Sequence, residues 1–411
     1  MTAPTKTLSR PEFVALMAVM MAMVAFSIDA MLPVLPRIAD ELSPGNPNAA
    51  QLILTSFLFG MGIGTLFAGP VSDAMGRKPA IYLGFALYLG GAALATIAPS
   101  LETMLLARIL QGLGAAGPRI VSTAIIRDRF EGREMARVLS FVMMIFIMIP
   151  AIAPFVGSLV IAAFGWRSIF GAFMIFALIG LTWLAVRQPE TLAPEARRPL
   201  RPASLKAALI EVLKHPMVRI YIAVLTLGQG QMFAFLSSVQ QVFGTVFGVR
   251  ETFPLWFMGI ALVSGSSTVL NATLVMRLGM RRMAMGAYAM QMALSAVLLA
   301  AGLLDAIPAA LTFPAFLLWA VSIFAMAGLT FGNINALALQ PMGHIAGMAA
   351  SVVGAVGTTL GVCIAIPIGL AFNGTIYPLM IGTLICSSLA WWLMRLSREA
   401  DPTPKKVIPA P

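Results

Sequence analysis

One acidic residue, Asp29, lies where a charge is unfavourable and where proton chemistry is therefore possible. It is the only one of the sixteen acidic residues deep inside an apolar run that could cross a membrane, here from about Phe13 to Pro36. A charged side chain at the bilayer centre costs at least about 2.5 to 3.5 kcal/mol, so intramembrane acids are usually functional. A carboxyl group in this position can bind and release a proton, and we interpret Asp29 as the proton site.

A charge of opposite sign, Arg108, falls in another apolar run. At about 1.5 Å per residue, Asp29 lies roughly 10 Å below the end of its run, and Arg108 lies about 9 Å below the same face. The shared depth predicts that the two runs face each other across a polar cavity and that Asp29 pairs with Arg108. Burial favours neutral Asp29 whereas Arg108 favours the charged form, so the balance could tip as the cavity opens to one face and then the other. The alternative is a permanent ion pair that only fixes helix packing.

The elements that would position these residues are membrane-spanning helices. Hydrophobic residues make up 59% of the 411-residue chain, charged residues 10%, and the mean hydropathy is +0.92. Runs long enough to cross a hydrocarbon core of roughly 30 Å recur along the whole chain. The sequence predicts an all-α integral membrane protein with twelve spans, at about 12–36, 50–72, 79–98, 102–124, 136–163, 168–187, 216–245, 252–276, 283–304, 311–337, 345–371 and 375–396.

A polar segment divides six spans from six and predicts four parts. Residues 1–187 form an N-terminal six-helix bundle, 188–215 a cytoplasmic linker, 216–396 a C-terminal six-helix bundle and 397–411 a cytoplasmic tail. Within the linker, apolar residues on one side of a short helix are typical of an interfacial amphipathic helix, and an ordinary soluble helix is the alternative. These apolar residues are Leu205, Leu209, Val212 and Leu213.

The net charge of +11 follows the topology rather than a polyanionic partner. If the N-terminus is cytoplasmic, 22 of the 27 Lys and Arg fall in cytoplasmic segments, as the positive-inside rule requires. Both termini are therefore expected inside, with membrane lipid and no nucleic acid among the partners.

Other chemistries lack the residues they need. No G-x-x-x-x-G-K-[ST], G-x-S-x-G or H-E-x-x-H pattern occurs in the sequence, which argues against an ATP-driven pump and against an enzyme. The two cysteines, Cys363 and Cys386, fall in apolar spans, and His215 and His344 have no ligand at metal-binding spacing. We expect no metal and no cofactor. A receptor or scaffold that does not transport stays open.

A short basic turn between the second and third spans of each half indicates an internal repeat. It runs from Gly69 to Lys78 in the first half and from Ala272 to Arg281 in the second, an offset of 203. The first copy, with Gly69, Asp73, Gly76, Arg77 and Lys78, resembles the G-x-x-x-D-x-x-G-R-K signature of the major facilitator superfamily. The resemblance implies that Asp73 faces the start of span eleven, that Arg77 pairs with Asp128 at the foot of span four, and that this cluster latches the outward-open state. Paired bases that only set topology are the alternative.

Further motifs resemble the drug/proton antiporters of twelve spans, and among them the bicyclomycin and chloramphenicol resistance (Bcr/CflA) type. Span one has an acid followed by two prolines, Asp29, Pro33 and Pro36. Span four matches the R-x-x-Q-G-x-G pattern, and span five is similar to the antiporter motif, with Ser158 where a second glycine is usual. The matching residues are Arg108, Gln111, Gly112 and Gly114 in span four and Pro150, Pro154 and Gly157 in span five.

The resemblance implies a monomer in the bacterial cell (inner) membrane, driven by the proton gradient, that exports lipophilic drugs or related small molecules by alternating access. Some relatives carry a second acid about two turns inward on span one, where Met20 to Met23 are uncharged here. A single carboxylate favours neutral or weakly charged substrates over strongly cationic dyes. A proton-linked or facilitative carrier of a metabolite, such as a sugar or an amino acid, is the alternative.

Substrate should bind near the midplane between the repeats. Besides Asp29, the polar candidates for the cavity wall are Gln229, Gln231 and Gln240 on span seven and Asn333 and Asn335 on span ten. Plain hydrogen bonding between helices is the alternative for each of them.

Overall fold

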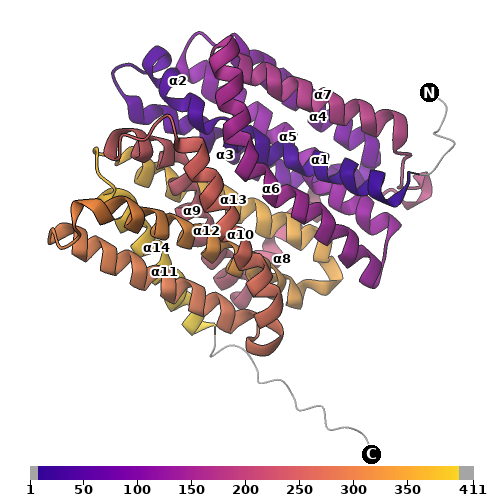
Figure 1. The fold of residues 1–411 in the computed structure, drawn as a ribbon. Helices are drawn as coiled ribbons and strands as arrows, with labels where there is room; N and C mark the ends of the chain where they lie inside the picture. The colour runs from indigo at the N-terminus through magenta and orange to yellow at the C-terminus, as the bar shows by residue number, and fades with distance from the viewer. Residues whose placement is uncertain (1–7, 398–411) are drawn as a thin grey trace, which may run out of the picture.

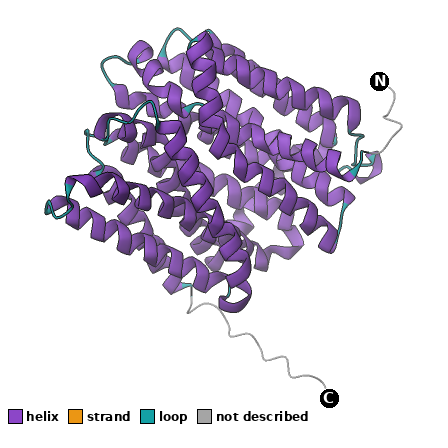
Figure 2. Ribbon diagram, viewed as in Figure 1, coloured by secondary structure: helices purple, strands orange, loops and turns teal. Residues whose placement is uncertain are grey.

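Long helices run side by side through the whole protein (Figure 1). The computed structural model describes residues 8–397, apart from the side chains at 136, 147 and 202, so most of the predicted tail at 397–411 lies outside the described residues. Figure 2 shows helices joined by short loops, and no strand is assigned within 8–397. The predicted all-α class is confirmed.

Eleven helical stretches of the described chain are long and apolar enough to cross a membrane. The longest, Ala309–Leu370, contains two helices, which a short 3-10 segment at Gln340–Ile345 separates. The twelve predicted spans are therefore present. The helices are α1 Arg10–Asp29, α2 Leu35–Leu42, α3 Gln51–Met75, α4 Arg77–Thr96, α5 Leu101–Arg129, α6 Gly132–Phe164, α7 Ser168–Arg187, α8 Pro202–Lys214, α9 Pro216–Gln241, α10 Phe253–Leu278, α11 Met280–Leu303, α12 Ala309–Leu339, α13 Ala346–Leu370 and α14 Tyr377–Leu396.

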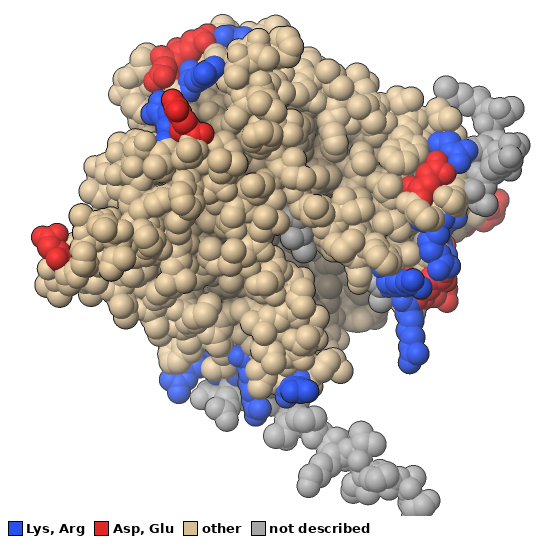
Figure 3. Space-filling model, in the orientation of Figure 1, with Lys and Arg blue, Asp and Glu red and all other residues tan. Residues whose placement is uncertain are grey.

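The charged residues gather at the two ends of the helix bundle, as Figure 3 shows. We call one end the basic end, where Arg77 begins α4, Arg129 ends α5, Arg187 ends α7 and Arg395 lies in the last turn of α14. The opposite end, which holds Arg37, Arg167 and Arg250, is the far end. This separation of charge reproduces the predicted asymmetry between the two sets of loops.

Helices α1 to α7 pack together, and so do α9 to α14; the two groups meet mainly where α3 packs along α13 and where α6 packs against α10. Small residues allow the first contact, because a Cβ at Gly62 would lie 2.5 Å from Oγ1 of Thr359. The surface is hollowed between the two groups on the side of the basic end (Figure 3). The protein is thus two helical groups joined along a seam, with an opening at one end.

Helix α8 of the linker packs against α9 and α13. Val212 is buried there, and Leu205 and Leu209 are half-buried, whereas Leu213, which the sequence placed on the same side, is exposed. Glu211 of this helix pairs with His344 at 2.6 Å, so the linker helix is attached to the second helical group.

Candidate functional site

Asp29 lies where the first span breaks. It is the last residue of α1, and the chain continues through a 3-10 turn, Leu32–Val34, into α2. Pro33 stands four residues after Asp29 and has no N–H, so it cannot donate the helical hydrogen bond to the carbonyl of Asp29. Asp29 is 4% exposed and is the only buried Asp or Glu among the described residues. The sequence therefore places its intramembrane acid at a discontinuity in the helix.

Arg108 does not pair with Asp29 in this structure. Its guanidinium donates to the carbonyl of Ser27 from Nη2 at 3.1 Å, to the carbonyl of Ile53 from Nε at 3.3 Å and to Gln111 Oε1 from Nη1 at 2.6 Å. The contact with Ser27 agrees with the predicted depth, two residues from Asp29. The predicted ion pair is nevertheless wrong for this conformation. The side chain of Ser27 points to α4, where it bonds the hydroxyl of Tyr88. Side chains two positions apart on a helix point about 200° apart, so the side chain of Asp29 points to another side of α1.

Glycines of the same motif let α5 approach its neighbours closely. A Cβ at Gly112 would overlap the carbonyl oxygen of Phe57 on α3, and one at Gly114 would overlap the backbone of Tyr88 on α4. The ring of Phe57 lies 4.4 Å from the guanidinium carbon of Arg108. Gln111 accepts from Arg108, while its Nε2 is buried without a partner. The motif thus packs α5 tightly around a buried arginine.

The antiporter motif of span five meets the Asp29 turn. Helix α6 is continuous through Pro150 and Pro154, and Gly157 lies against α1, where a Cβ would overlap the carbonyl oxygen of Ala30. Ser158, which replaces the usual glycine, donates to the carbonyl of Pro154 at 2.9 Å. The glycine of this motif therefore fixes how closely α6 approaches the residue after Asp29.

Replacing Gly157 with alanine is expected to destabilise the protein by about 1 to 3 kcal/mol, because the added methyl has to displace backbone atoms. The measurement is the free energy of unfolding in mixed detergent micelles. Gly259→Ala on α10 is the matched control, since a Cβ there meets no atom within 4 Å, and it should be neutral or stabilise by up to about 1 kcal/mol. Equal stability of the two variants would contradict the close contact.

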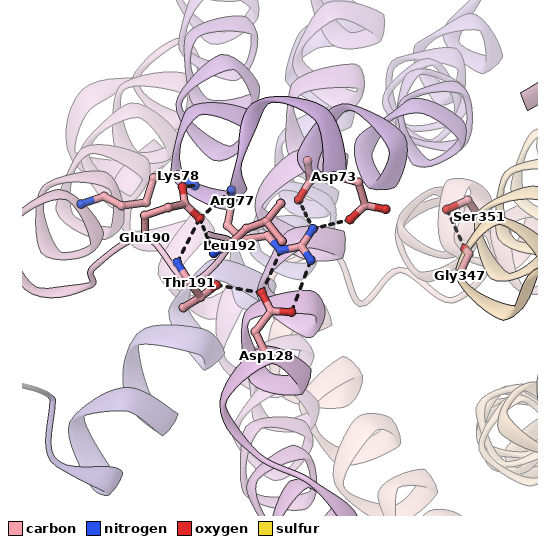
Figure 4. Close-up of polar contacts among 10 residues, drawn as sticks. Asp73, Arg77, Lys78, Asp128, Glu190, Thr191, Leu192, Gly347 and Ser351 are labelled. Atoms are coloured by element: carbon pink, nitrogen blue, oxygen red, sulfur yellow. Dashed lines mark hydrogen bonds and ion pairs between the residues drawn. The ribbon is translucent and has the colours of Figure 1, made fainter. Parts of the chain in front are cut away.

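The signature turn forms a cluster at the basic end (Figure 4). Arg77 donates from Nε to Asp128 at 2.9 Å, and from Nη1 to Asp73 at 2.5 Å and to Ser72 at 2.8 Å. Arg77 is buried, whereas the side chains of Asp73 and Asp128 are 46% and 17% exposed. The structure thus brings Asp73, Arg77 and Asp128 together as the resemblance implied.

The sequence missed a third acid in this cluster, Glu190 of the linker. Its carboxylate accepts from the backbone N–H groups of Arg77 and Lys78, each at 2.9 Å, and so caps the N-terminus of α4. Thr191 adds a bond from its Oγ1 to Asp128 at 2.8 Å. Glu190 lies three residues after the last residue of α7, so a scan for acids near helix ends would have found it, but only the fold shows which helix it caps.

Asp73 points toward the start of α13, where Ser351 lies (Figure 4). Gly69 comes close to the same residue, since a Cβ there would lie 3.1 Å from Oγ of Ser351. No hydrogen bond or ion pair joins the side chains of Asp73, Arg77 or Asp128 to α13 within residues 8–397, and Lys78 donates to the carbonyl of Ala185 at 3.1 Å. The bonds of this cluster stay within the first helical group and the linker. Its role as a latch therefore stays a prediction.

Two equivalent glycines give the internal repeat a structural basis. Gly76 separates α3 from α4 with φ +104°, and Gly279, 203 residues later, separates α10 from α11 with φ +82°. Only glycine adopts such angles without strain. The same backbone turn therefore occurs in both halves, although the second lost the acid.

At the far end, a polar clasp joins the two helical groups; we define it by Asn48, Gln51, Ser238 and Gln241. Gln51 donates to Gln241 at 2.6 Å and accepts from Ser238 at 3.1 Å, and Gln241 donates to Asn48 at 2.9 Å. Asn48 also donates to the carbonyl of Phe372 after α13, at 2.7 Å. The clasp uses neutral groups, whose hydrogen bonds can be exchanged for water when the ends separate.

The candidates for the cavity wall do not gather in one place. Gln231 is buried and accepts from Ser387 on α14 at 2.8 Å, and Asn333 donates to Asn271 on α10 at 2.7 Å, so both bond inside the second helical group. These contacts agree with the alternative of hydrogen bonding between helices, and substrate binding by either residue stays a prediction. Residues two apart on α9 face opposite ways, so Gln231 turns away from Gln229. Gln229 lies beside Gly357 of α13 with Oε1 buried and unpartnered, Asn335 is half-buried, and Gln240 lines a cavity at the far end.

Known proteins resemble the chain over almost its full length. The multidrug resistance protein MdtL of Escherichia coli is 30% identical over 89% of this chain and 90% of its own. A bicyclomycin resistance protein homolog of Haemophilus influenzae is 29% identical over 85% and 86%. An uncharacterized MFS-type transporter, YdgK, of Bacillus subtilis is 30% identical over 89% and 91%.

Among solved structures, a D-xylose-proton symporter superposes with a TM-score of 0.70 at 15% identity, over 92% of this chain and 97% of the symporter. At this low sequence identity, the similarity shows only that the two proteins share a fold. The family model described as Major Facilitator Superfamily matches residues 16–367. A fold of twelve spans in two helical groups, the signature turn and this match together show that the chain is a multi-pass membrane protein of the major facilitator superfamily.

Proposed function

We propose that this protein exports lipophilic drugs or related small molecules in exchange for protons. The observation that carries the proposal is Asp29, a buried acid at the break of the first span. Relatives named for multidrug and bicyclomycin resistance support the substrate class. The proton gradient is the energy source in this proposal, with a monomer as the working unit and no cofactor.

Alternating access would link the two movements. In the present arrangement the polar clasp joins the halves at the far end, and the hollow opens at the basic end. Substrate would enter from the basic end, while Asp29 releases its proton to that side. After the clasp opens and the basic end closes, Asp29 would take a proton from the far side and the substrate would leave. Each cycle then moves one proton against one substrate molecule.

The orientation follows from the charges. The basic end holds most of the Lys and Arg and would face the cytoplasm, so both termini would be cytoplasmic. The relatives come from bacteria, which favours the bacterial cell (inner) membrane. Since Asp29 is the only buried acid described, at most one negative charge would be available inside the bundle. This favours neutral or weakly charged substrates.

Transport into proteoliposomes with an acidic interior tests the function. We expect at least one lipophilic drug of a panel of amphenicols, bicyclomycin, lipophilic weak acids and cationic dyes to accumulate, and an ionophore that collapses the pH gradient to abolish accumulation. A sugar and an amino acid belong in the same panel. Saturable movement of either, without movement of any drug, would overturn export of drugs and favour a metabolite carrier.

A further inference from the structure

A second arginine of α5, Arg119, lies inside the span without a role in the cluster, the clasp or the Asp29 turn. It follows Leu101 by eighteen residues and precedes Arg129 by ten, so it lies about 27 Å and about 15 Å from the two ends of the helix. This is near the middle of the bundle. The residue is half-buried, so part of its side chain keeps accessible surface.

The polar surroundings of Arg119 differ from those of Arg108. All three nitrogen atoms of the Arg108 guanidinium donate to oxygen atoms. Arg119 has one contact of this kind, from Nη1 to the sulfur of Met61 on α3 at 3.7 Å. A thioether is a weak acceptor. Arg119 forms no ion pair within residues 8–397, so no acid of the described chain neutralises its charge.

Asp29 cannot supply the missing charge. Arg119 follows Arg108 by three turns, so the two share a face of α5, about 20° apart, and are separated by about 16.5 Å along the axis. Arg108 bonds the carbonyl of Ser27 and is therefore level with Asp29. Arg119 lies three turns nearer the basic end, where α1 carries only uncharged residues from Phe13 to Ile28.

A cavity lies just past Arg119 along α5, toward the basic end. This cavity of about 190 Å³ lies between α3, α5 and α13, and α5 contributes Ile120, the next residue, and Thr123, one turn on. It reaches Asp73 and Arg77, so it extends to the basic end, where the hollow opens (Figure 3). A molecule that entered this cavity would reach Ile120 and Thr123, which adjoin Arg119 along α5.

We propose that Arg119 binds the anionic group of the exported substrate, which is a lipophilic weak acid carried as its monoanion. The inference rests on the proposed function and narrows its substrate class. A guanidinium holds a carboxylate through two parallel hydrogen bonds, and the adaptable thioether of Met61 suits the apolar part. The absence of a second intramembrane acid, which disfavours cations, agrees with this charge.

Charge movement follows from the sign of the substrate. Export of a monoanion against one proton moves two charges per cycle, whereas a neutral substrate moves one. Transport of the anion should therefore respond more steeply to membrane potential than transport of a neutral analogue. In vesicles, an imposed potassium diffusion potential at constant pH gradient would measure this difference.

Two matched probes test the binding assignment: pyrenebutyrate, a lipophilic carboxylate, and its neutral amide. Both are titrated by fluorescence anisotropy against the full chain in nanodiscs of neutral lipid. Wild type should bind the carboxylate about tenfold or more tightly than the amide, as a charged hydrogen bond provides. Arg119→Gln should lose this preference, and Arg119→Lys should keep part of it. Arg219→Gln, an exposed arginine of α9, is the matched control and should keep it fully.

A wild-type protein without the preference, or an unchanged preference in Arg119→Gln, overturns the proposal. If Arg119→Gln does not fold, Arg119→Lys replaces it as the test. An undiminished preference of Arg119→Lys for the carboxylate over the amide would then overturn the proposal. Phosphatidylglycerol added to the nanodiscs tests whether Arg119 binds a lipid headgroup and not a substrate. If this lipid abolishes the preference for the carboxylate, the site belongs to lipid. Binding is measured without a gradient, so it decides the role of Arg119 even if proton-driven transport fails for both probes.

Discussion

Asp29→Asn is expected to reduce proton-driven transport to the rate of empty vesicles, while the protein still folds and still binds substrate. The physical reason is that asparagine keeps the size and polarity of the side chain but cannot carry a proton. Asp29 is the only buried acid described, so no other carboxyl group inside the bundle can replace it. The measurement is drug accumulation under an imposed pH gradient, with wild type and variant at equal protein content.

Asp40→Asn is the matched control for this prediction. Asp40 lies eleven residues later, in α2, and is exposed at the far end. The Asp40→Asn protein should transport drug at the wild-type rate. Exchange of labelled against unlabelled drug, without a gradient, should persist in Asp29→Asn because it needs no net proton movement. Sustained accumulation that depends on the gradient in Asp29→Asn would end the assignment of Asp29 as the proton site.

Arg77→Ala is expected to lower the free energy of unfolding by about 3 kcal/mol. Breaking a buried ion pair by removing one partner costs about 3 to 5 kcal/mol, and the lower end applies because Asp73 and Asp128 keep contact with water. The measurement is unfolding in mixed micelles. Arg77→Lys should lower the free energy of unfolding less, since lysine keeps the positive charge but lacks the forked hydrogen bonding of the guanidinium.

Arg10→Ala serves as the control for Arg77→Ala. Arg10 pairs with Glu134, and both side chains are about half exposed, at 55% and 45%. An exposed pair contributes less than about 1 kcal/mol, so the loss should be small. A loss at Arg77 no greater than that at Arg10 would show that the cluster contributes little to stability, and the latch would need another basis.

The fold could be predicted from the sequence to a large extent, because each span must supply its own backbone hydrogen bonds in lipid and so has to be a long apolar helix. The turn at Gly76 and its copy at Gly279 were also readable, since the glycines mark a backbone that other residues adopt with strain. The predicted depth of Arg108 was also right, because the rise per residue of an α-helix is fixed.

Direction around a helix was harder to predict than depth. The ion pair of Asp29 with Arg108 failed on this point, and Gln231 and Asn333 bond side chains of neighbouring helices within the second helical group. Each polar side chain found a nearer partner, a backbone carbonyl or a neighbouring helix, which periodicity alone does not show. Glu190 was missed because the linker returns to a turn more than a hundred residues earlier, a contact that only the fold determines.

The capped turn has a mechanical consequence for the linker. Glu190 holds the linker to the start of α4, and the N–H of Arg198 donates to the carbonyl of Asp73 at 2.9 Å. Helix α8, packed on the second helical group, begins at Pro202. Four residue steps remain between these attachments, which reach at most about 14 Å when extended. The connection is short, and any wider separation of the halves at this point has to break the bond of Arg198 to Asp73 or release α8 from the second helical group.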